Sequence, residues 1–235
     1  MTLSGSDFNF IIKYPFSGKD WFVRICLQGA VLMLLCPFLI GIPFFTGFVM
    51  TITRRGIDGS ADYPGWNEWG LFWKRGWKAL VINFVYYIPI LVIFFTYFAV
   101  VLIPILIGTA TEVDEIAAIG AIFGAFGMVL LYACLFFYMN FFAVVQMATA
   151  PLIALDVPLS ASFQFKQYIW PYIKANALNL VLAWLISYIA GLVAAMGMVF
   201  LFFGLFLTLP IAVAITAYAH GVIYRISPVK YKGQS

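Results

Sequence analysis

Charged side chains are rare in this sequence. Asp, Glu, Lys and Arg make up 9% of its 235 residues, against about 25% in an ordinary soluble domain. Hydrophobic residues make up 65%, and the mean hydropathy is +1.04. A water-soluble globule could not cover so much apolar surface, so the composition predicts an integral membrane protein. No polar block is long enough to fold separately, and we therefore expect a single membrane domain over residues 1–235.

The residues of common catalytic and metal sites are also scarce. The sequence has one histidine, His220, and its three cysteines lie in apolar runs without metal-binding spacing. It shows no paired carboxylates in an apolar segment, no Ser-His-Asp set and no glycine loop for phosphates. We therefore predict a protein that is not an enzyme and holds no metal. His220 could ligate a haem or chlorin, although a lone histidine more often makes a hydrogen bond. No other cofactor is implied.

Charge is missing altogether from the segments 25–53, 79–111, 116–155 and 175–224. A helix rises about 1.5 Å per residue, so about 20 apolar residues cross a bilayer core of about 30 Å. The last three segments therefore predict an all-α, polytopic transmembrane helical bundle with four full spans. These spans are 79–107, 117–150, 177–199 and 203–224.

The first uncharged segment, 25–53, is interrupted by Pro37, Gly41 and Pro43. Proline removes a backbone donor, which lipid does not replace. The segment is thus either one kinked span or a re-entrant hairpin that turns near Cys36–Pro43. Three cations before it favour a cytoplasmic N-terminus and therefore the hairpin. We expect no cleavable signal peptide, because this run lacks a small-x-small exit.

Aromatic residues and cations are concentrated between Tyr63 and Lys78, directly before the span at 79–107. Indole rings favour the headgroup layer, and Lys and Arg favour its cytoplasmic side. We expect a short amphipathic helix lying on the membrane here, and a weaker copy at 158–176. Membrane lipids are therefore an expected partner. The expected interface anchors are Trp66, Trp69, Trp73, Trp77, Lys74, Arg75, Lys78, Trp170 and Lys174.

The distribution of charge predicts the orientation. Segments 54–78 and 158–176 and the C-terminal tail are basic, whereas the loop at 109–116 carries three acids and no cation. Basic segments tend to stay in the cytoplasm, so we expect a cytoplasmic C-terminus. Because these cations flank apolar segments, they do not indicate a nucleic-acid partner.

An internal repeat accompanies this pattern. Lys78-Ala-x-x-x-Asn83 recurs as Lys174-Ala-x-x-x-Asn179, and an Asp precedes each copy at a similar distance. The match indicates a duplication of 25–107 and 117–199, followed by the last span. So biased a composition could also produce part of the match by chance.

Polar and small residues inside the spans predict contacts between helices. Asn83, Asn140, Gln146 and Asn179 should face other helices and bond across them. The same groups could line a transport pathway, but most such pathways include a buried acid or base, and these spans contain no Asp, Glu, Lys or Arg. Small residues spaced by three or four, in particular Gly120, Gly124 and Gly127 and the pair Gly191 and Ala195, indicate close helix packing.

Three motifs resemble those of a known family. Gly47 to Arg55 ends an apolar segment with paired arginines; Pro64 to Lys78 carries Pro-x-Trp-x-x-Trp-Gly; and Tyr87-Ile-Pro89 follows. Together they resemble the uncharacterised prokaryotic membrane family called domain of unknown function 4013. The C-terminal half is similar more loosely, over Ala161–Asn176 and the ending at Arg225. The resemblance implies a multi-helix protein of a bacterial or archaeal cytoplasmic membrane, and it implies no catalytic or ligand residue.

Three functions are compatible with these features. The uncharged interior and abundant apolar surface favour a non-enzymatic accessory or assembly subunit, bound to other membrane subunits or to itself. A small transporter or channel is the alternative, with the break at Pro37–Pro43 near a binding site. A porphyrin-binding subunit that uses His220 is the weakest.

Overall fold

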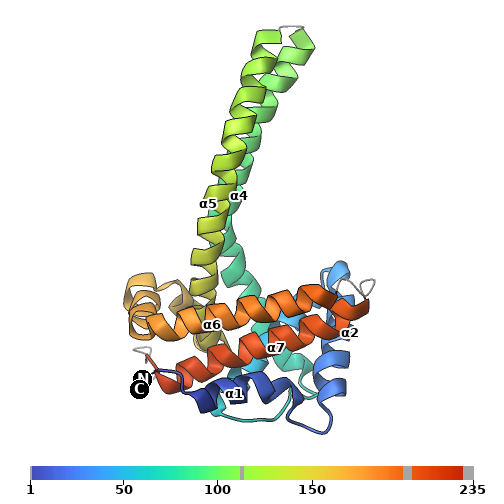
Figure 1. The fold of residues 1–235 in the computed structure, drawn as a ribbon, viewed down its shortest axis with the longest axis vertical. Helices are drawn as coiled ribbons and strands as arrows, with labels where there is room; N and C mark the ends of the chain where they lie inside the picture. The colour runs from blue at the N-terminus through green and yellow to red at the C-terminus, as the bar shows by residue number, and fades with distance from the viewer. Residues whose placement is uncertain (1, 112–113, 198–202, 230–235) are drawn as a thin grey trace. The chain divides into compact units, whose positions relative to one another are not determined.

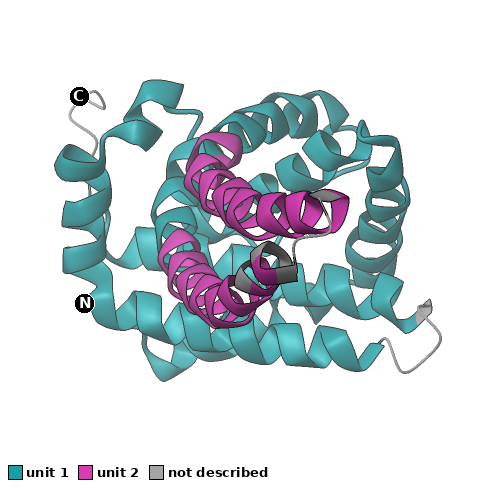
Figure 2. Ribbon diagram, turned by 90° about the horizontal axis from the view of Figure 1, so that it is seen from above, with its two compact units in different colours: residues 1–82, 144–235 teal, residues 83–143 magenta. Residues whose placement is uncertain are grey.

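The computed structural model describes residues 2–111, 114–197 and 203–229, and over these residues it is helical without a strand. The all-α prediction is confirmed. Two compact units are formed by residues 1–82 with 144–235 (unit 1) and by residues 83–143 (unit 2; Figure 2). The α-helices are α1 (Gly5–Lys13), α2 (Gln28–Leu34), α3 (Gly41–Asp58), α4 (Trp69–Thr111), α5 (Asp114–Ala154), α6 (Trp170–Met196) and α7 (Phe203–Ile226). Shorter 3-10 or π-helical turns are η1 (Tyr14–Phe16), η2 (Phe22–Leu27), η3 (Cys36–Phe38), η4 (Leu159–Phe163) and η5 (Phe165–Ile169).

Four helices are long and apolar enough to cross a membrane, and they correspond to the four predicted spans. They are residues 69–110, 120–154, 165–196 and 204–226. The chain is therefore a multi-pass membrane protein. Parts of three predicted features lie outside the described residues. They are residues 112–113 of the acidic loop, residues 198–202 at and after the end of the predicted span 177–199, and residues 230–235 of the basic tail.

Helix α7 organises unit 1 by packing against both α3 and α6 (Figure 1). Its buried face carries Ala214, Ala217 and Ala219 beside Tyr218. These small side chains let α3 come close, and a Cβ on Gly56 of α3 would lie only 2.5 Å from the Tyr218 carbonyl oxygen. The two helices therefore meet backbone to backbone, as small-residue interfaces in membranes do.

The first apolar segment turns between α2 and α3. The Gly41 N–H bonds back to the Leu35 carbonyl at 3.1 Å, and Leu39 between them has a positive φ of 59°. Helices α2 and α3 contact each other after the turn. The break predicted at Cys36–Pro43 is confirmed as a turn, and a single kinked helix over 25–53 is wrong, because this backbone reversal interrupts the helical hydrogen bonds.

The predicted anchor stretch is divided: residues 63–68, with Trp66, lie before α4, and Trp69 to Lys78 form its first turns. A separate helix before the span is wrong, because α4 runs from Trp69 through Lys78 into the predicted span as one helix, and the residues around this junction, Trp77 to Val81, include no proline or glycine to end it. The start of α4 crosses α3 at two glycines. A Cβ on Gly76 would lie 1.7 Å from the Pro43 carbonyl oxygen, and one on Gly47 would lie 1.7 Å from that of Phe72.

Unit 2 contains the later part of α4 and the earlier part of α5. Gly120, Gly124 and Gly127 of α5 face α4: a Cβ on Gly127, for example, would lie 2.9 Å from the ring of Tyr97. The Tyr97 hydroxyl donates to the Gly124 carbonyl at 3.0 Å. The predicted packing role of these three glycines is confirmed, and it is internal to unit 2. Gly191 on α6 has no such neighbour within 4 Å.

Candidate functional site

The C-terminus of α5 places one carboxylate, Asp156, at the centre of the most charged site that the structure describes. The Asp156 N–H donates to the Ile153 carbonyl at 3.0 Å, and the Val157 N–H donates to that of Leu152 at 3.1 Å. With φ at 59° for Asp156, this is the Schellman ending of a helix, in which a left-handed residue closes the last turn. Asp is one of the few side chains other than glycine that this conformation tolerates.

Three cations from the first turns of α4 surround Asp156. Arg75 donates through Nη2 to Asp156 Oδ2 at 3.0 Å. The Nζ atoms of Lys74 and Lys78 lie 3.7 and 3.8 Å from Oδ1, and Lys78 also donates to the Asp156 carbonyl at 3.3 Å. Positions 74 and 78 are one helical turn apart and so share a face of α4. The same face binds both the carboxylate and the carbonyl end of α5.

Arg75 is the buried member of this cluster, with 7% of its side chain exposed. Its Nη1 donates to Thr51 Oγ1 at 3.3 Å, which links the cluster to α3. Its Nε has no hydrogen-bond partner among the described residues. Arg75 therefore differs from the surface position expected of an interface anchor, whereas Lys74 is 62% exposed.

Asp156 is held in its charged form. Partial burial would raise the pKa of this carboxyl group, but the hydrogen bond and charge of Arg75, with the charges of Lys74 and Lys78, lower it below its ordinary value. One negative charge faces three positive ones, and the α5 C-terminus adds about half a negative charge. The site keeps an excess of positive charge and is chemically suited to bind anions.

A second ion pair fixes the entry to α4. Arg55 at the end of α3 donates to Glu68 Oε1 at 2.8 Å, and the same oxygen accepts the Gly65 N–H at 2.8 Å. The segment before α4 is thereby tied to α3. This pair fixes the helix that carries the three cations.

The predicted tryptophan anchors divide into packed and exposed rings. Trp69 and Trp73 both contact Phe44, with ring centroids 5.2 and 5.1 Å away. Trp66, Trp73 and Trp77 are each more than one-third exposed. In the second copy, Trp170 is exposed and lies 5.2 Å below the ammonium of Lys174, a cation–π contact. Exposed indoles around a basic cluster are typical of a lipid headgroup layer.

Unit 1 also contains a cluster of buried tyrosines that the sequence did not indicate. Tyr14 stacks on Tyr218 with ring centroids 4.0 Å apart, and its hydroxyl donates to the Asp62 carbonyl at 3.2 Å. The Tyr63 hydroxyl donates to the Tyr14 carbonyl at 3.0 Å and accepts the Gly18 N–H at 2.7 Å. Burial raises the pKa of Tyr14 well above its ordinary value. These phenol groups therefore stay neutral, and their hydrogen bonds and ring contacts connect η1, the segment before α4, and α7.

The polar residues predicted inside the spans are spread over the structure. Asn179 is buried and accepts the Leu3 N–H at 2.9 Å, so it holds the segment before α1. Asn140 donates to the Phe136 carbonyl of its own helix at 2.8 Å. Asn83 and Gln146 are half-buried. None of these contacts tests a transport role, which stays a prediction.

His220 lies on α7 with its Nε2 atom shielded and without a hydrogen-bond partner among the described residues. An axial ligand of a porphyrin needs an open position beside that nitrogen. The packing around Nε2 shows no such opening, and the ligand role stays a prediction. Over the described ranges, three or more His, Cys, Asp or Glu side chains nowhere gather as a metal site would require.

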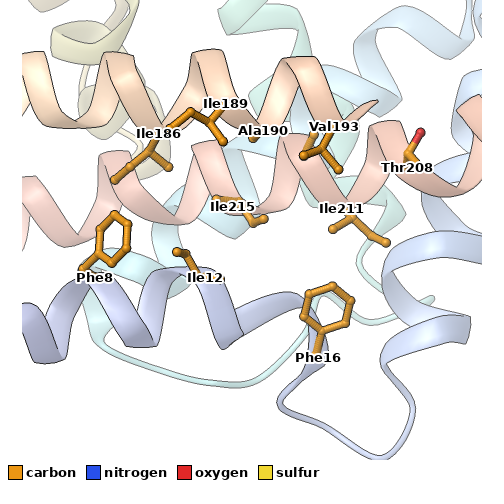
Figure 3. A pocket seen from close by; sticks show the side chains of 11 residues that line it. Phe8, Ile12, Phe16, Ile186, Ile189, Ala190, Val193, Thr208, Ile211 and Ile215 are labelled. Atoms are coloured by element: carbon orange, nitrogen blue, oxygen red, sulfur yellow. The ribbon is translucent and has the colours of Figure 1, made fainter. Parts of the chain in front are cut away.

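An apolar groove of about 290 Å³ lies in unit 1 between α1 and η1 on one side and α6 and α7 on the other. Figure 3 shows Phe8 and Phe16 facing Ile186 and Ile211 across it. Its one hydroxyl, on Thr208, already donates within the α6–α7 pair, to the Ala194 carbonyl at 3.0 Å. The groove thus suits hydrocarbon and offers little to a polar ligand.

Asp156 is the residue of this candidate site that the sequence patterns did not single out. It is the last acid of the chain, and it directly follows the uncharged segment 116–155. The densest group of cations lies far away in the sequence, between residues 74 and 78. A single acid at the end of a long uncharged segment was the feature that could have drawn attention to it. The pairing itself depends on how the two ends of the α4–α5 hairpin return to unit 1, which no local pattern encodes.

Comparison with protein-family models matches residues 30–203 to the family described as Protein of unknown function (DUF4013). The matched range contains Asp156 and all three of its cations. No curated protein and no solved structure matches the chain significantly.

Proposed function

This chain belongs to the DUF4013 family, and we propose that it is a non-enzymatic accessory or assembly subunit of a larger complex in the cytoplasmic membrane of a bacterium or archaeon. The basic segments support a cytoplasmic C-terminus. The proposed role is to bind other membrane subunits through apolar helix surface.

The length of the uncharged helices in unit 2 is the observation that carries this proposal. Residues 83–111 of α4 contain no charged side chain and extend over about 43 Å at about 1.5 Å per residue. The hydrocarbon core is about 30 Å thick. Lipid alone would have to accommodate the excess of about 13 Å by tilt, by a locally thicker bilayer or by placing the ends of the helix in the headgroup layers. Another protein is the natural cover for the excess apolar length.

The side chains of unit 2 supply a surface of the right chemistry. Phe126 is 78% exposed, Val129 is 73% exposed and Phe137 is 72% exposed, and the most apolar window of α4 contains no buried residue. These side chains offer an apolar surface that lipid tails or another apolar helix can cover.

The charged side chains support a structural rather than a catalytic role. Arg55 binds Glu68, Arg54 binds Asp58, and Arg75 binds Asp156. Each pair joins or stabilises elements of unit 1. Proton relays and ion-coupled transport ordinarily place an acid or base inside a span, and the uncharged segments of this sequence offer no Asp, Glu, Lys or Arg and a single histidine, His220.

A co-purification comparison tests the proposal. The tagged full chain is expressed at its native level and extracted into lipid nanodiscs, as wild type and as the triple variant Phe126→Ala, Val129→Ala, Phe137→Ala. The matched control carries three substitutions of exposed apolar residues on α6, which lie outside unit 2. They are Leu178→Ala, Val181→Ala and Ile189→Ala. We expect a membrane protein in fixed ratio to the wild type, lost from the unit 2 variant and kept by the control.

Loss of the partner from both variants, or from neither, would contradict a role for the unit 2 surface. A wild-type particle without any partner would contradict the subunit role itself. Transport stays the alternative prediction, since the reversal at Leu39 is the kind of break found near transporter sites. Flux in proteoliposomes that depends on Pro43 would favour it.

A further inference from the structure

We propose that Lys74, Arg75 and Lys78 form a binding site for a phosphate group, carried by an anionic phospholipid headgroup or by a free phosphate compound. This inference does not depend on the subunit role. It rests on the charge, the exposure and the unused donors of the cluster around Asp156.

The charge of the cluster exceeds what its structural role requires. Holding the end of α5 needs the Arg75–Asp156 contact, at 3.0 Å, and the bond from Lys78 to the Asp156 carbonyl. Three cations face one carboxylate and about half a charge from the helix end. The remaining excess of about one and a half charges matches a phosphodiester or phosphomonoester.

The donors that remain are placed to meet one anion. The ammonium groups of Lys74 and Lys78 lie 3.7 and 3.8 Å from the same oxygen of Asp156, which is too far for a strong hydrogen bond. Both groups therefore approach the same point without a hydrogen bond to that oxygen, and they have donors left for phosphate oxygens. Arg75 adds positive charge rather than a free donor, because its side chain is more than nine-tenths buried and its Nε is shielded.

The surroundings favour access from a lipid headgroup layer. The Lys74 side chain is 62% exposed, and the neighbouring Trp73 and Trp77 rings are exposed and contact each other edge to face, 5.5 Å apart. Indoles beside lysines are typical of the headgroup depth of a bilayer. The second basic segment, with Lys166 and Lys174, lacks a comparable set around one carboxylate in the described residues.

Native mass spectrometry of the purified full chain in a neutral detergent tests the site. The three probes are phosphatidylglycerol, phosphatidylcholine and inorganic phosphate. The site variant is Lys74→Gln with Lys78→Gln, and the matched control is Lys166→Gln with Lys174→Gln. Because each surface lysine changes affinity for an anionic lipid about fivefold, we expect the site variant to weaken phosphatidylglycerol binding by about 25-fold and the control to leave it nearly unchanged.

Asp156→Asn separates a ligand site from a simple clamp. Removing the competing carboxylate should strengthen anion binding while the fold becomes less stable, whereas a clamp alone predicts the loss of stability only. Binding of phosphatidylglycerol but not phosphate would assign the site to a lipid headgroup, and binding of inorganic phosphate would assign it to a free phosphate compound. Equal binding of both lipids without phosphate binding, or equal losses in both double variants, would overturn the proposal.

Discussion

Arg75 and Asp156 are 81 positions apart in the sequence, yet the guanidinium Nη2 lies 3.0 Å from the carboxylate. One residue sits near the start of α4 and the other just beyond the end of α5. Residues 83–143 form unit 2, and this ion pair joins the chain segment that precedes unit 2 to the segment that follows it. Loss of the ion pair should weaken the contact between these two segments first.

Asp156→Asn should lower the stability of the protein. Asn keeps the size of the side chain and tolerates the left-handed conformation, so the change isolates the charge. Breaking a fully buried pair costs about 3–5 kcal/mol, but Asp156 is 31% exposed, and we expect about 1–2 kcal/mol after solvent screening. Thermal unfolding in detergent measures the effect. The control Asp58→Asn, in the exposed pair with Arg54, should change stability by less than about 0.5 kcal/mol; an equal effect would contradict the account.

Stability should fall in acid because of the same residue. The pKa of Asp156 is lowered in the folded protein from an ordinary value of 3.8, so the folded state favours the charged form. Its contribution is complete above the unfolded pKa and is lost as pH falls below about 4 through the folded pKa. Unfolding of wild type and Asp156→Asn, followed from pH 6 to pH 3, should converge at the acid end. Parallel curves over that range would exclude this linkage.

Gly76→Ala and Gly70→Ala should act in opposite directions although both lie in the first turns of α4. A Cβ at Gly76 would lie 1.7 Å from the Pro43 carbonyl, while one at Gly70 would meet nothing within 4 Å. Overpacking costs about 1–3 kcal/mol or more, whereas alanine is favoured over glycine in a helix by up to about 1 kcal/mol. Melting temperatures of the two variants check this. A tolerated Gly76→Ala would show that α3 and α4 do not cross there.

Tyr63→Phe should destabilise the tyrosine cluster. It removes the hydroxyl that accepts the Gly18 N–H and donates to the Tyr14 carbonyl, and buried groups left unpaired cost about 1–3 kcal/mol. Tyr188→Phe, at a ring that is 58% exposed, is the control and should be nearly neutral. Denaturation of the three proteins in the same detergent compares them. Similar stability for Tyr63→Phe and wild type would mean that water replaces these bonds.

The four spans could be predicted from the sequence because length and absence of charge are local properties. The turn at Leu39 was predictable in place, since Pro37, Gly41 and Pro43 weaken any helix there. The uninterrupted α4 was not expected. The density of Trp and Lys before the span indicated an interface, but interfacial residues do not by themselves end a helix, and Gly76 lies inside α4 at its close contact with α3.

The candidate site was predictable in part. Lys74, Arg75 and Lys78 were recognised as a group from their density beside the tryptophans. Their shared partner was not recognised, because the α4–α5 hairpin separates Asp156 from them in the sequence. The tyrosine cluster could not be predicted from the sequence for a similar reason. Tyr14, Tyr63 and Tyr218 come from three distant segments, and a stack of that kind depends on tertiary packing that periodicity does not report.

The mass of the particle in native nanodiscs tests the central claim most directly. Native mass spectrometry, with the lipid contribution subtracted, should give a mass that exceeds the 26.3 kDa of this chain by a second membrane protein in fixed stoichiometry. The unit 2 variant should return the mass to that of the single chain. A wild-type particle of 26.3 kDa, or of a simple multiple of it, would contradict an accessory subunit of a larger complex.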